Sequence, residues 1–305
     1  MRRGAKCTPN RAADPGRFGV HSARPGCPPL GGRPQPAAGG KKFTPEDFQA
    51  IQHDNTSLPG LALVRLLKAV DVQDRELRPY VELLAGWDGV LSAGSRAGAL
   101  YGVWLGELLD GFYRPHVPAR LLDFTAARGG VPVMLAALER PEAAWFGDRP
   151  AEGRDRLLRA TFRKAVGRAR KLLPGDDKEW SWGRLHTTTF RHPLSALGPA
   201  YAKAFDLGPV PRAGDAHTPN AATHNAQFEH TSGATYRHVF DLADWDRGVA
   251  TSAPGQSGQP GSPHYADLLP LWQKGDYFPL AFSRARVEKV TSHRLQLTPA
   301  EGASP

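Results

Sequence analysis

Histidines and carboxylates gather in the second half of this 305-residue chain, where they could bind a metal ion or move protons. Seven of the eleven histidines fall between residues 186 and 264, and four follow one another six to eight residues apart: His217, His224, His230 and His238. Zinc sites usually space their ligands about three to five residues apart on one element, and no HExxH motif occurs here. We therefore expect no metal site and no cofactor. A metal-dependent enzyme that uses the His217–His238 cluster remains an alternative.

A serine nucleophile is the second chemistry that the sequence offers. Gln256 and Ser257 lie between two glycines, Gly255 and Gly258, in a stretch rich in glycine and proline. The Gly-x-Ser-x-Gly elbow of serine hydrolases needs one residue between the serine and each glycine, and that spacing is not met. The stretch is therefore predicted to be a structural loop whose backbone approaches another segment closely.

Residues 180–186 form the other dense motif, with two tryptophans, Trp180 and Trp182, and His186, followed by His192. Tryptophans of this kind usually fill a core, while the histidines bond to nearby carbonyl groups. The alternative is that these side chains line a substrate pocket.

The elements that must position these residues differ between the two halves of the chain. A helix is predicted to begin after Thr44, because a hydroxyl N-cap, Pro45 and the acids of the first turn all favour a helix start. Apolar side chains at helical spacing predict further helices at 58–70, 74–85, 97–113, 131–138 and 155–173. The segment 97–113 is apolar almost all round and is predicted to be buried, whereas 155–173 is basic and exposed on one side.

After residue 173 the pattern changes. Strands are predicted in 180–192, 235–242 and 293–297, turns in 254–263, and one helix in 264–273. The fold class is therefore α+β, with a helical first half (43–173) and a β-rich second half (174–297).

Residues 1–42 carry most of the net charge. Their nine Lys and Arg against one acid, Asp14, give +8 of the total +9, so the rest of the chain is close to neutral. Both cysteines, Cys7 and Cys27, also lie here and cannot cross-link the rest. The Pro, Gly and Arg content predicts a disordered basic segment over 1–42, followed by one domain at 43–297 and a tail at 298–305.

This charge distribution bears on the possible partners. A short basic segment without interleaved aromatic residues gives weak, salt-sensitive affinity, so we expect no nucleic-acid partner, and a basic interaction module remains an alternative. The sequence has no run of about 18 apolar residues, so we expect no membrane partner. The first 30 residues lack the apolar core of a signal peptide, and the compartment stays undetermined.

Short segments between residues 43 and 297 match, in order and spacing, those of one enzyme family. The segments are 43–48 (FTPEDF), 52–57 (QHDNTS), 84–89 (LAGWDG), 182–186 (WGRLH), Gly214-Asp215 with Asn220, 232–237 (SGATYR), 254–258 (PGQSG) and 262–265 (SPHY). In these segments the chain resembles the C-terminal part of the larger subunit of penicillin acylases, which are N-terminal-nucleophile hydrolases.

The resemblance implies a fold and a reaction. The fold has layers of helices around antiparallel sheets. The reaction is hydrolysis of a linear amide C–N bond by an N-terminal serine, which self-cleavage of a precursor releases. The free amine of that serine is the general base, and a backbone N–H with an Asn side chain stabilises the oxyanion. Family substrates include penicillins and related antibiotic side-chain amides, acyl-homoserine lactones and cyclic lipopeptides, and intact members are commonly periplasmic or secreted.

One departure from the family limits what this chain can do. The family nucleophile is a serine followed by asparagine, and none of the thirteen serines here precedes an asparagine. The nucleophile and the oxyanion Asn are expected upstream of residue 43, so we predict an incomplete fold, no catalytic residue in this chain, no calcium site, and inactivity of the chain alone. Either the chain is a truncated product, or an upstream acylase polypeptide completes it so that it acts on a small-molecule amide. The candidate pocket-lining or structural residues are Trp182, His186, His192, Asn220, Arg237, Gln256, Ser257 and His264.

Overall fold

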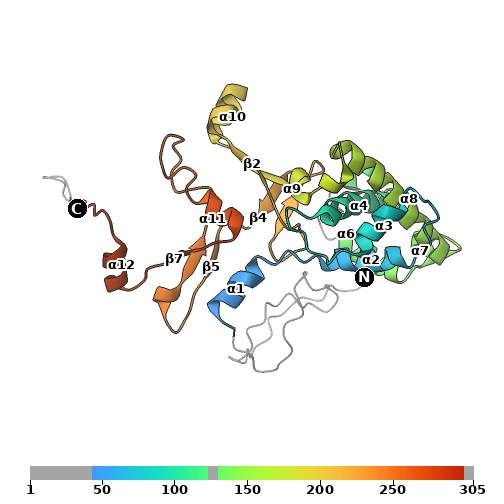
Figure 1. Cartoon of the computed structure of the whole chain (residues 1–305), viewed down its shortest axis with the longest axis horizontal. Coiled ribbons are helices and arrows are strands. Elements are labelled where there is room, and N and C mark those ends of the chain that lie inside the picture. The colour runs from blue at the N-terminus through green and yellow to red at the C-terminus, as the bar shows by residue number, and fades with distance from the viewer. Residues whose placement is uncertain (1–42, 123–129, 299–305) are drawn as a thin grey trace, which may run out of the picture. The chain divides into compact units, whose positions relative to one another are not determined.

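The computed structural model describes residues 43–122 and 130–298, where a helical half is followed by seven short strands with further helices among and after them (Figure 1). The predicted disordered segment 1–42 lies outside the described residues, as does the predicted tail beyond residue 298. The helices are α1 (Pro45–Gln52), α2 (Leu58–Lys68), α3 (Arg78–Ala85), α4 (Arg96–Tyr113), α6 (Gly130–Glu139), α7 (Ala143–Phe146), α8 (Pro150–Leu172), α9 (Trp182–Leu185), α10 (Pro199–Phe205), α11 (Leu269–Lys274) and α12 (Arg284–Val290). Short 3-10 turns, including η2 (Asp177–Glu179) and η3 (Pro193–Leu197), separate some of them.

The helical half was predicted well, because its signals are local. Thr44 caps α1 as expected, and its hydroxyl accepts a hydrogen bond from the Asp47 N–H while the Asp47 carboxylate accepts one from the Thr44 N–H. The expected helices 58–70, 97–113, 131–138 and 155–173 correspond to α2, α4, α6 and α8. The helix expected at 74–85 begins later, at Arg78, after a turn at 74–77.

Helix α4 forms the centre of the hydrophobic core. It packs against α8 and α9, and Figure 1 shows it within the group formed by α2, α3, α6 and α8. Trp104 of α4 is fully buried, meets Phe162 of α8 edge to face, and donates a hydrogen bond from Nε1 to Thr161 Oγ1. The predicted burial of 97–113 is therefore correct along most of the helix.

The strands form three small antiparallel sheets. Strand β1 (Thr187–Phe190) pairs with β2 (Leu207–Pro211), and β3 (Ala222–His224) pairs with β4 (His230–Gly233). Strand β6 (Val249–Thr251) lies between β5 (Arg237–Val239) and β7 (Phe278–Pro279). The α+β fold class is confirmed, although the strands are short and helices α9 to α12 interrupt the half that was predicted to be β-rich.

Three predictions in the second half were wrong in detail. Residues 293–297 form no strand, because Leu295 and Leu297 are 83% and 85% exposed and no described strand lies beside them. The helix expected over 264–273 begins only at Leu269, after a series of turns. Within 180–192 only residues 187–190 form a strand, because residues 182–185 form the short helix α9. The first N–H of α9, that of Trp182, donates a hydrogen bond to the Ser95 carbonyl.

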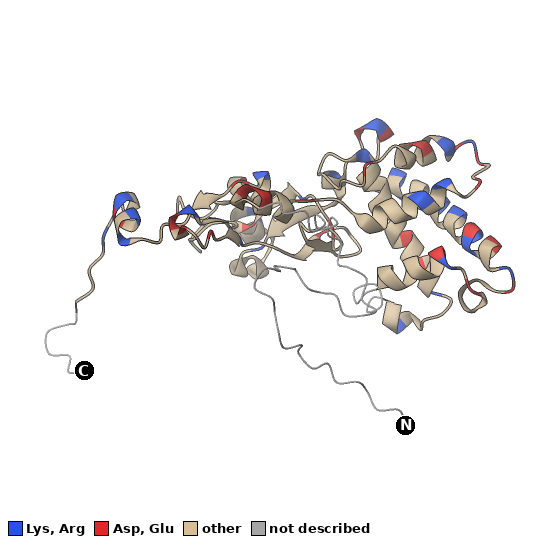
Figure 2. Ribbon diagram, turned by 90° about the horizontal axis from the view of Figure 1, so that it is seen from below, with Lys and Arg blue, Asp and Glu red and all other residues tan. Residues whose placement is uncertain are grey.

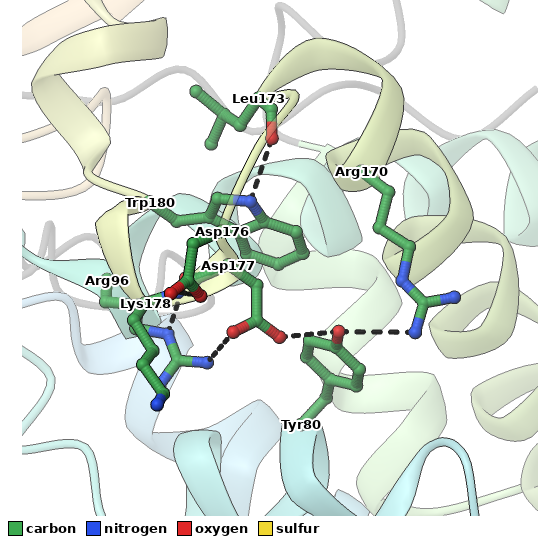
Figure 3. Close-up of polar contacts among 8 residues, drawn as sticks. All are labelled: Tyr80, Arg96, Arg170, Leu173, Asp176, Asp177, Lys178 and Trp180. Atoms are coloured by element: carbon green, nitrogen blue, oxygen red, sulfur yellow. Dashed lines mark hydrogen bonds and ion pairs between the residues drawn. The ribbon is translucent and has the colours of Figure 1, made fainter.

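A polar clamp at Asp177 joins three helices to the turn η2 (Figure 3). The Asp177 carboxylate accepts hydrogen bonds from the Tyr80 hydroxyl (2.7 Å) and from Arg96 Nη2 (2.9 Å). The backbone carbonyl of Asp177 accepts a further hydrogen bond from Arg96 Nε. Arg170 of α8 donates to the same Tyr80 hydroxyl, and the Tyr80 ring stacks on Trp180. The clamp therefore fixes the point at which the chain leaves the helical half.

Replacing Asp177 with alanine should lower the free energy of unfolding by about 1–3 kcal/mol, because Tyr80 and Arg96 lose a charged acceptor that is partly shielded from solvent. Urea denaturation followed by circular dichroism measures this loss. Glu179→Ala removes an exposed acid from the same turn and should change stability by less than about 0.5 kcal/mol. Equal losses in both variants would show that the clamp does not stabilise the protein.

Among residues 43–122 and 130–298, no helix has both the length and the apolar character needed to span a bilayer.

Candidate active-site wall

The eight residues singled out from the sequence fall into three groups in the structure. Trp182 and His186 lie together in the core, where their rings are 4.8 Å apart. Asn220 and Arg237 are joined by a hydrogen bond. The remaining four, His192, Gln256, Ser257 and His264, belong to the segment before α10 and to the loop 254–264.

The loop 254–264 is held by its backbone. The Ser257 N–H donates to the His264 carbonyl (3.0 Å), and the Ser257 hydroxyl accepts a hydrogen bond from the Gln259 N–H. Gly255 lies so close to the backbone of 264–265 that an added Cβ would come within 2.3 Å of the His264 carbonyl oxygen. This is the close backbone approach that the glycines predicted, and Ser257 has no histidine side chain as a hydrogen-bond partner among the described residues.

Trp182 has a structural position. Its side chain is 0% exposed, its Nε1 donates to the Gly214 carbonyl (2.9 Å), and its ring lies against Gly102 of α4. Of the two alternatives for this motif, the structure supports the core position, since Trp182 does not line the cavity described below.

Asn220 is the centre of a buried polar group. Its Oδ1 accepts hydrogen bonds from Arg212 Nη2 (2.9 Å) and Arg237 Nη2 (2.6 Å), and its Nδ2 donates to Asn55 Oδ1 (2.8 Å). Arginine can only donate, so the amide must turn its oxygen toward the two guanidinium groups. The orientation of the Asn220 amide is thus fixed, and only one of the two Nδ2 hydrogens is used in these bonds.

Local structure explains why Asn220 is held there. The hydroxyl of Thr218 donates to the Asn220 carbonyl and accepts from the Asp215 N–H, which stabilises the turn before Asn220. Gly214, at φ +77°, approaches the Asn220 carbonyl so closely that a Cβ would lie 2.3 Å from its oxygen. The Asn220 N–H bonds to the Asp54 carbonyl, which attaches this turn to the segment after α1.

Two arginines beside Asn220 are buried without a carboxylate partner. Arg212 follows β2 and Arg237 begins β5, and they are 4% and 5% exposed. No ion pair joins either arginine to an acid within the described parts of the chain. Burial, and then the charge of Arg237, lower the pKa of Arg212 to about 9, and burial also lowers the pKa of Arg237. Both side chains still carry positive charge at neutral pH.

A cavity of about 300 Å³ opens beside Arg212 and Asn220. Its other walls include His53, Asn55, Trp272 and Lys274. The guanidinium carbon of Arg212 lies 4.3 Å from the centre of the Trp272 ring, which is a cation–π contact. Burial, followed by the charges of Arg237 and Arg212, lowers the pKa of His53 to about 4, so this wall residue is neutral at pH 7.

The histidines of the cluster pack against one another and against aromatic side chains. No group of three or more His, Cys, Asp or Glu residues that could hold a metal ion occurs within the described ranges, so the alternative that used His217, His224, His230 and His238 is not supported. The structure instead places His186, His224 and His230 ring against ring, with centroids 5.4 and 5.9 Å from His186. Burial is the largest cause that lowers the pKa of all three, to about 3 for His186 and about 4 for His230. His186 is thus a neutral core histidine, and the half-buried His224 and His230 pack against it.

Sequence reasoning missed part of this site. It singled out Asn220 and Arg237 but not Arg212, Trp272 or His53. His53 and Asn55 stand within the matched segment 52–57, so that segment carried a usable signal. The sequence held no signal for Arg212 or Trp272, because these two residues take part in the site through a contact with each other across 60 positions of the chain, Arg212 over the Trp272 ring.

The basic helix predicted at 155–173 corresponds to α8, and several of its cations are partnered. Arg163 pairs with Asp74 (2.8 Å), and Arg168 pairs with Glu107 (3.0 Å). Figure 2 shows Lys and Arg intermixed with Asp and Glu on the helical part. This gives little support to the alternative of a basic interaction module.

Comparison with known proteins decides the family. The sequence profile of the family described as penicillin amidase matches residues 34–289, most of the chain. The chain belongs to the penicillin amidase family. The resemblance seen in the sequence motifs is confirmed, and with it the assignment to a family of amide hydrolases.

Two curated relatives show how much of the family protein is present. The chain is 32% identical to penicillin acylase 2 proenzyme of Pseudomonas sp. strain SE83, over 83% of this chain and 33% of that protein. It is 27% identical to the acyl-homoserine lactone acylase QuiP of Pseudomonas aeruginosa, over 87% of this chain and 36% of that protein. The chain thus spans about a third of the length of these penicillin amidase relatives.

A solved structure supports the fold. The thermostable penicillin G acylase from Alcaligenes faecalis superposes with a TM-score of 0.52 and 19% sequence identity, covering 84% of this chain and 49% of that one. The described helices and antiparallel sheets therefore belong to the N-terminal-nucleophile hydrolase fold of the penicillin amidase family.

Proposed function

We propose that this chain forms one wall of an amide-hydrolysing centre, in which the Asn220 amide donates a hydrogen bond to the oxyanion. The N-terminal serine is then supplied by an acylase segment outside these 305 residues. The observation that carries the proposal is the fixed Asn220 amide, whose oxygen is held by two buried arginines while one Nδ2 hydrogen has no acceptor in the bonds described above. A donor that is oriented before the reaction stabilises developing negative charge without reorganisation.

This proposal departs in one respect from the expectation based on sequence. That expectation placed the oxyanion Asn before residue 43 and no catalytic residue in this chain. Asn220 has the burial, the fixed orientation and the cationic surroundings that an oxyanion donor needs. We keep in the proposal that the nucleophile lies outside these residues, since no serine in the sequence precedes an asparagine. The chain alone is therefore proposed to be inactive.

The proposed substrates are linear amides of the antibiotic side-chain or acyl-homoserine lactone type. Support comes from the two relatives above, one a penicillin acylase and the other an acyl-homoserine lactone acylase. The proposed partner is an upstream acylase polypeptide that carries the serine.

Co-expression of this chain with the proposed upstream acylase polypeptide tests the proposal. The mixture should hydrolyse a chromogenic acyl amide, and neither part alone should do so. In the active mixture, Asn220→Asp is expected to lower kcat about 100- to 1000-fold with little change in KM, because it removes the donor. Aspartate has the same shape and can pair with Arg212 and Arg237, so the fold should be retained.

The matched control is Asn225→Asp, a substitution of the same chemistry in the turn between β3 and β4, where Asn225 caps the turn. It should leave kcat within about twofold, which corresponds to less than about 0.5 kcal/mol. Full activity of the Asn220→Asp mixture, with correct folding shown by circular dichroism, would rule out Asn220 as the oxyanion donor.

A further inference from the structure

The two buried arginines beside Asn220 have more hydrogen-bonding capacity than the protein uses. Arg212 Nε and Arg237 Nη1 are buried and have no hydrogen-bond partner. A buried guanidinium without a counterion is costly, and removing a charge of this kind often stabilises a protein. Both arginines donate to the single oxygen of Asn220, which is neutral and cannot balance two positive charges.

The charge around the cavity beside Arg212 is strongly one-sided. Its lining includes two cations, Arg212 and Lys274, and no Asp or Glu. His53 on the same wall is neutral at pH 7, because its pKa is lowered to about 4 by burial and by the two arginines. Asp276 is exposed and close enough to act on His53, but it does not line the cavity. An anion in this cavity would therefore meet two positive charges and no carboxylate among the lining residues.

The chemistry and the size of the site suit a small carboxylate. The guanidinium carbon of Arg212 lies 4.3 Å from the centre of the Trp272 ring, and its Nη2 donates to Asn220, which leaves further N–H groups of this guanidinium for a ligand. A planar guanidinium edge matches the two oxygens of a carboxylate. A cavity of about 300 Å³ is at the small end of ligand pockets, so the molecule must be small.

We propose that the cavity lined by Arg212, Trp272 and Lys274 binds the carboxylate of a small organic molecule. Assigning that carboxylate to the substrate or product of amide hydrolysis rests on the proposed function, since the cavity adjoins Asn220. The binding itself does not depend on that function, because every group involved belongs to this chain.

Isothermal titration of the purified chain with phenylacetate, and separately with its uncharged methyl ester, tests the proposal. The carboxylate should bind about 10- to 100-fold more tightly than the ester, as expected for the loss of one charged hydrogen-bonded pair. This comparison uses only the natural sequence, so it does not depend on whether a variant folds. Equal affinities for acid and ester would overturn the proposal, and so would equally tight binding of inorganic phosphate, which would indicate a general anion site.

Two variants locate the binding. Arg212→Met keeps the apolar stem of the side chain and removes the charge, so it should abolish phenylacetate binding while the free protein melts at the same or a higher temperature. Arg184→Gln, on the exposed side of α9, removes the same charge away from the cavity and should leave binding unchanged. Binding that survives Arg212→Met would overturn the proposal. Carboxylate binding by a chain whose co-expressed mixture shows no amide hydrolysis would support this site and reject the proposed function alone.

Discussion

The protein should lose stability steadily as the pH falls from about 6.5 toward 4, because the neutral His186 is buried in its core. An unfolded histidine takes up a proton below about pH 6.5. Burial, and then the neighbouring His224, hold the pKa of folded His186 near 3. Between these two values the unfolded state binds more protons, so stability is fully present above the unfolded pKa and is lost as the pH falls toward the folded pKa.

The size of this effect follows from His186. Each pH unit below about 6.5 lowers the free energy of unfolding by about 1.4 kcal/mol for one such histidine, or about 2 kcal/mol at pH 5. His230 and His53, whose pKa values are lowered to about 4, act in the same direction but are partly exposed and contribute less. Asp215 acts in the opposite direction, since burial raises its pKa and protonation in acid favours the folded state. The net loss is large beside a typical total stability of about 5–15 kcal/mol.

Urea unfolding measured at half-unit steps from pH 8 to pH 4.5 checks this prediction. His186→Asn keeps an N–H donor near the position of Nδ1, which bonds to the Arg212 carbonyl, but it cannot titrate. The variant should be less stable at pH 8 and should show a slope against pH that is shallower by up to about one proton. Trp104→Phe, which destabilises the core without removing a titrating group, should keep the natural slope. Equal slopes in His186→Asn and the natural protein would contradict the prediction.

The features that could be predicted from the sequence are those determined by neighbouring residues. The start of α1 was predicted because Thr44, Pro45 and Asp47 act within one helical turn. The burial of α4 was predicted because its apolar residues surround the helix. In contrast, the strand predicted at 293–297 does not form, since a strand needs a partner and none of the described strands lies beside it.

The candidate site likewise combines residues that could be predicted from the sequence with residues that could not. Asn220 and Arg237 were singled out because they stand in segments that match the family. The contact between Asn220 and Asn55 joins residues 165 positions apart, and the burial of Arg212 depends on the pairing of β1 with β2 and on Trp272. No local pattern encodes these distances, so the pair of uncompensated arginines could be recognised only in the folded chain.

Gly102→Ala is expected to destabilise the protein by about 1–3 kcal/mol, although alanine is the better helix former. A Cβ at Gly102 would lie 2.4 Å from Trp182 Cζ3 and 2.9 Å from Cη2. Trp182 cannot move aside easily, because its Nε1 is bonded to the Gly214 carbonyl and its N–H to the Ser95 carbonyl. Gly167 of α8 is the matched control, since a Cβ there meets nothing within 4 Å and Gly167→Ala should stabilise the protein by about 0.5–1 kcal/mol.

A double-mutant cycle shows whether this contact connects the helical half to the turn that carries Asn220. Trp182→Phe should cost about 2–4 kcal/mol, since it opens a cavity in the core and removes the hydrogen bond to Gly214. The smaller ring also leaves room for a methyl group at residue 102. Adding Gly102→Ala to Trp182→Phe should therefore cost less than Gly102→Ala alone, with a favourable coupling of about 1–2 kcal/mol. Strict additivity, or a Gly102→Ala protein as stable as Gly167→Ala, would mean that Trp182 adapts freely and does not fix the packing of α9 on α4.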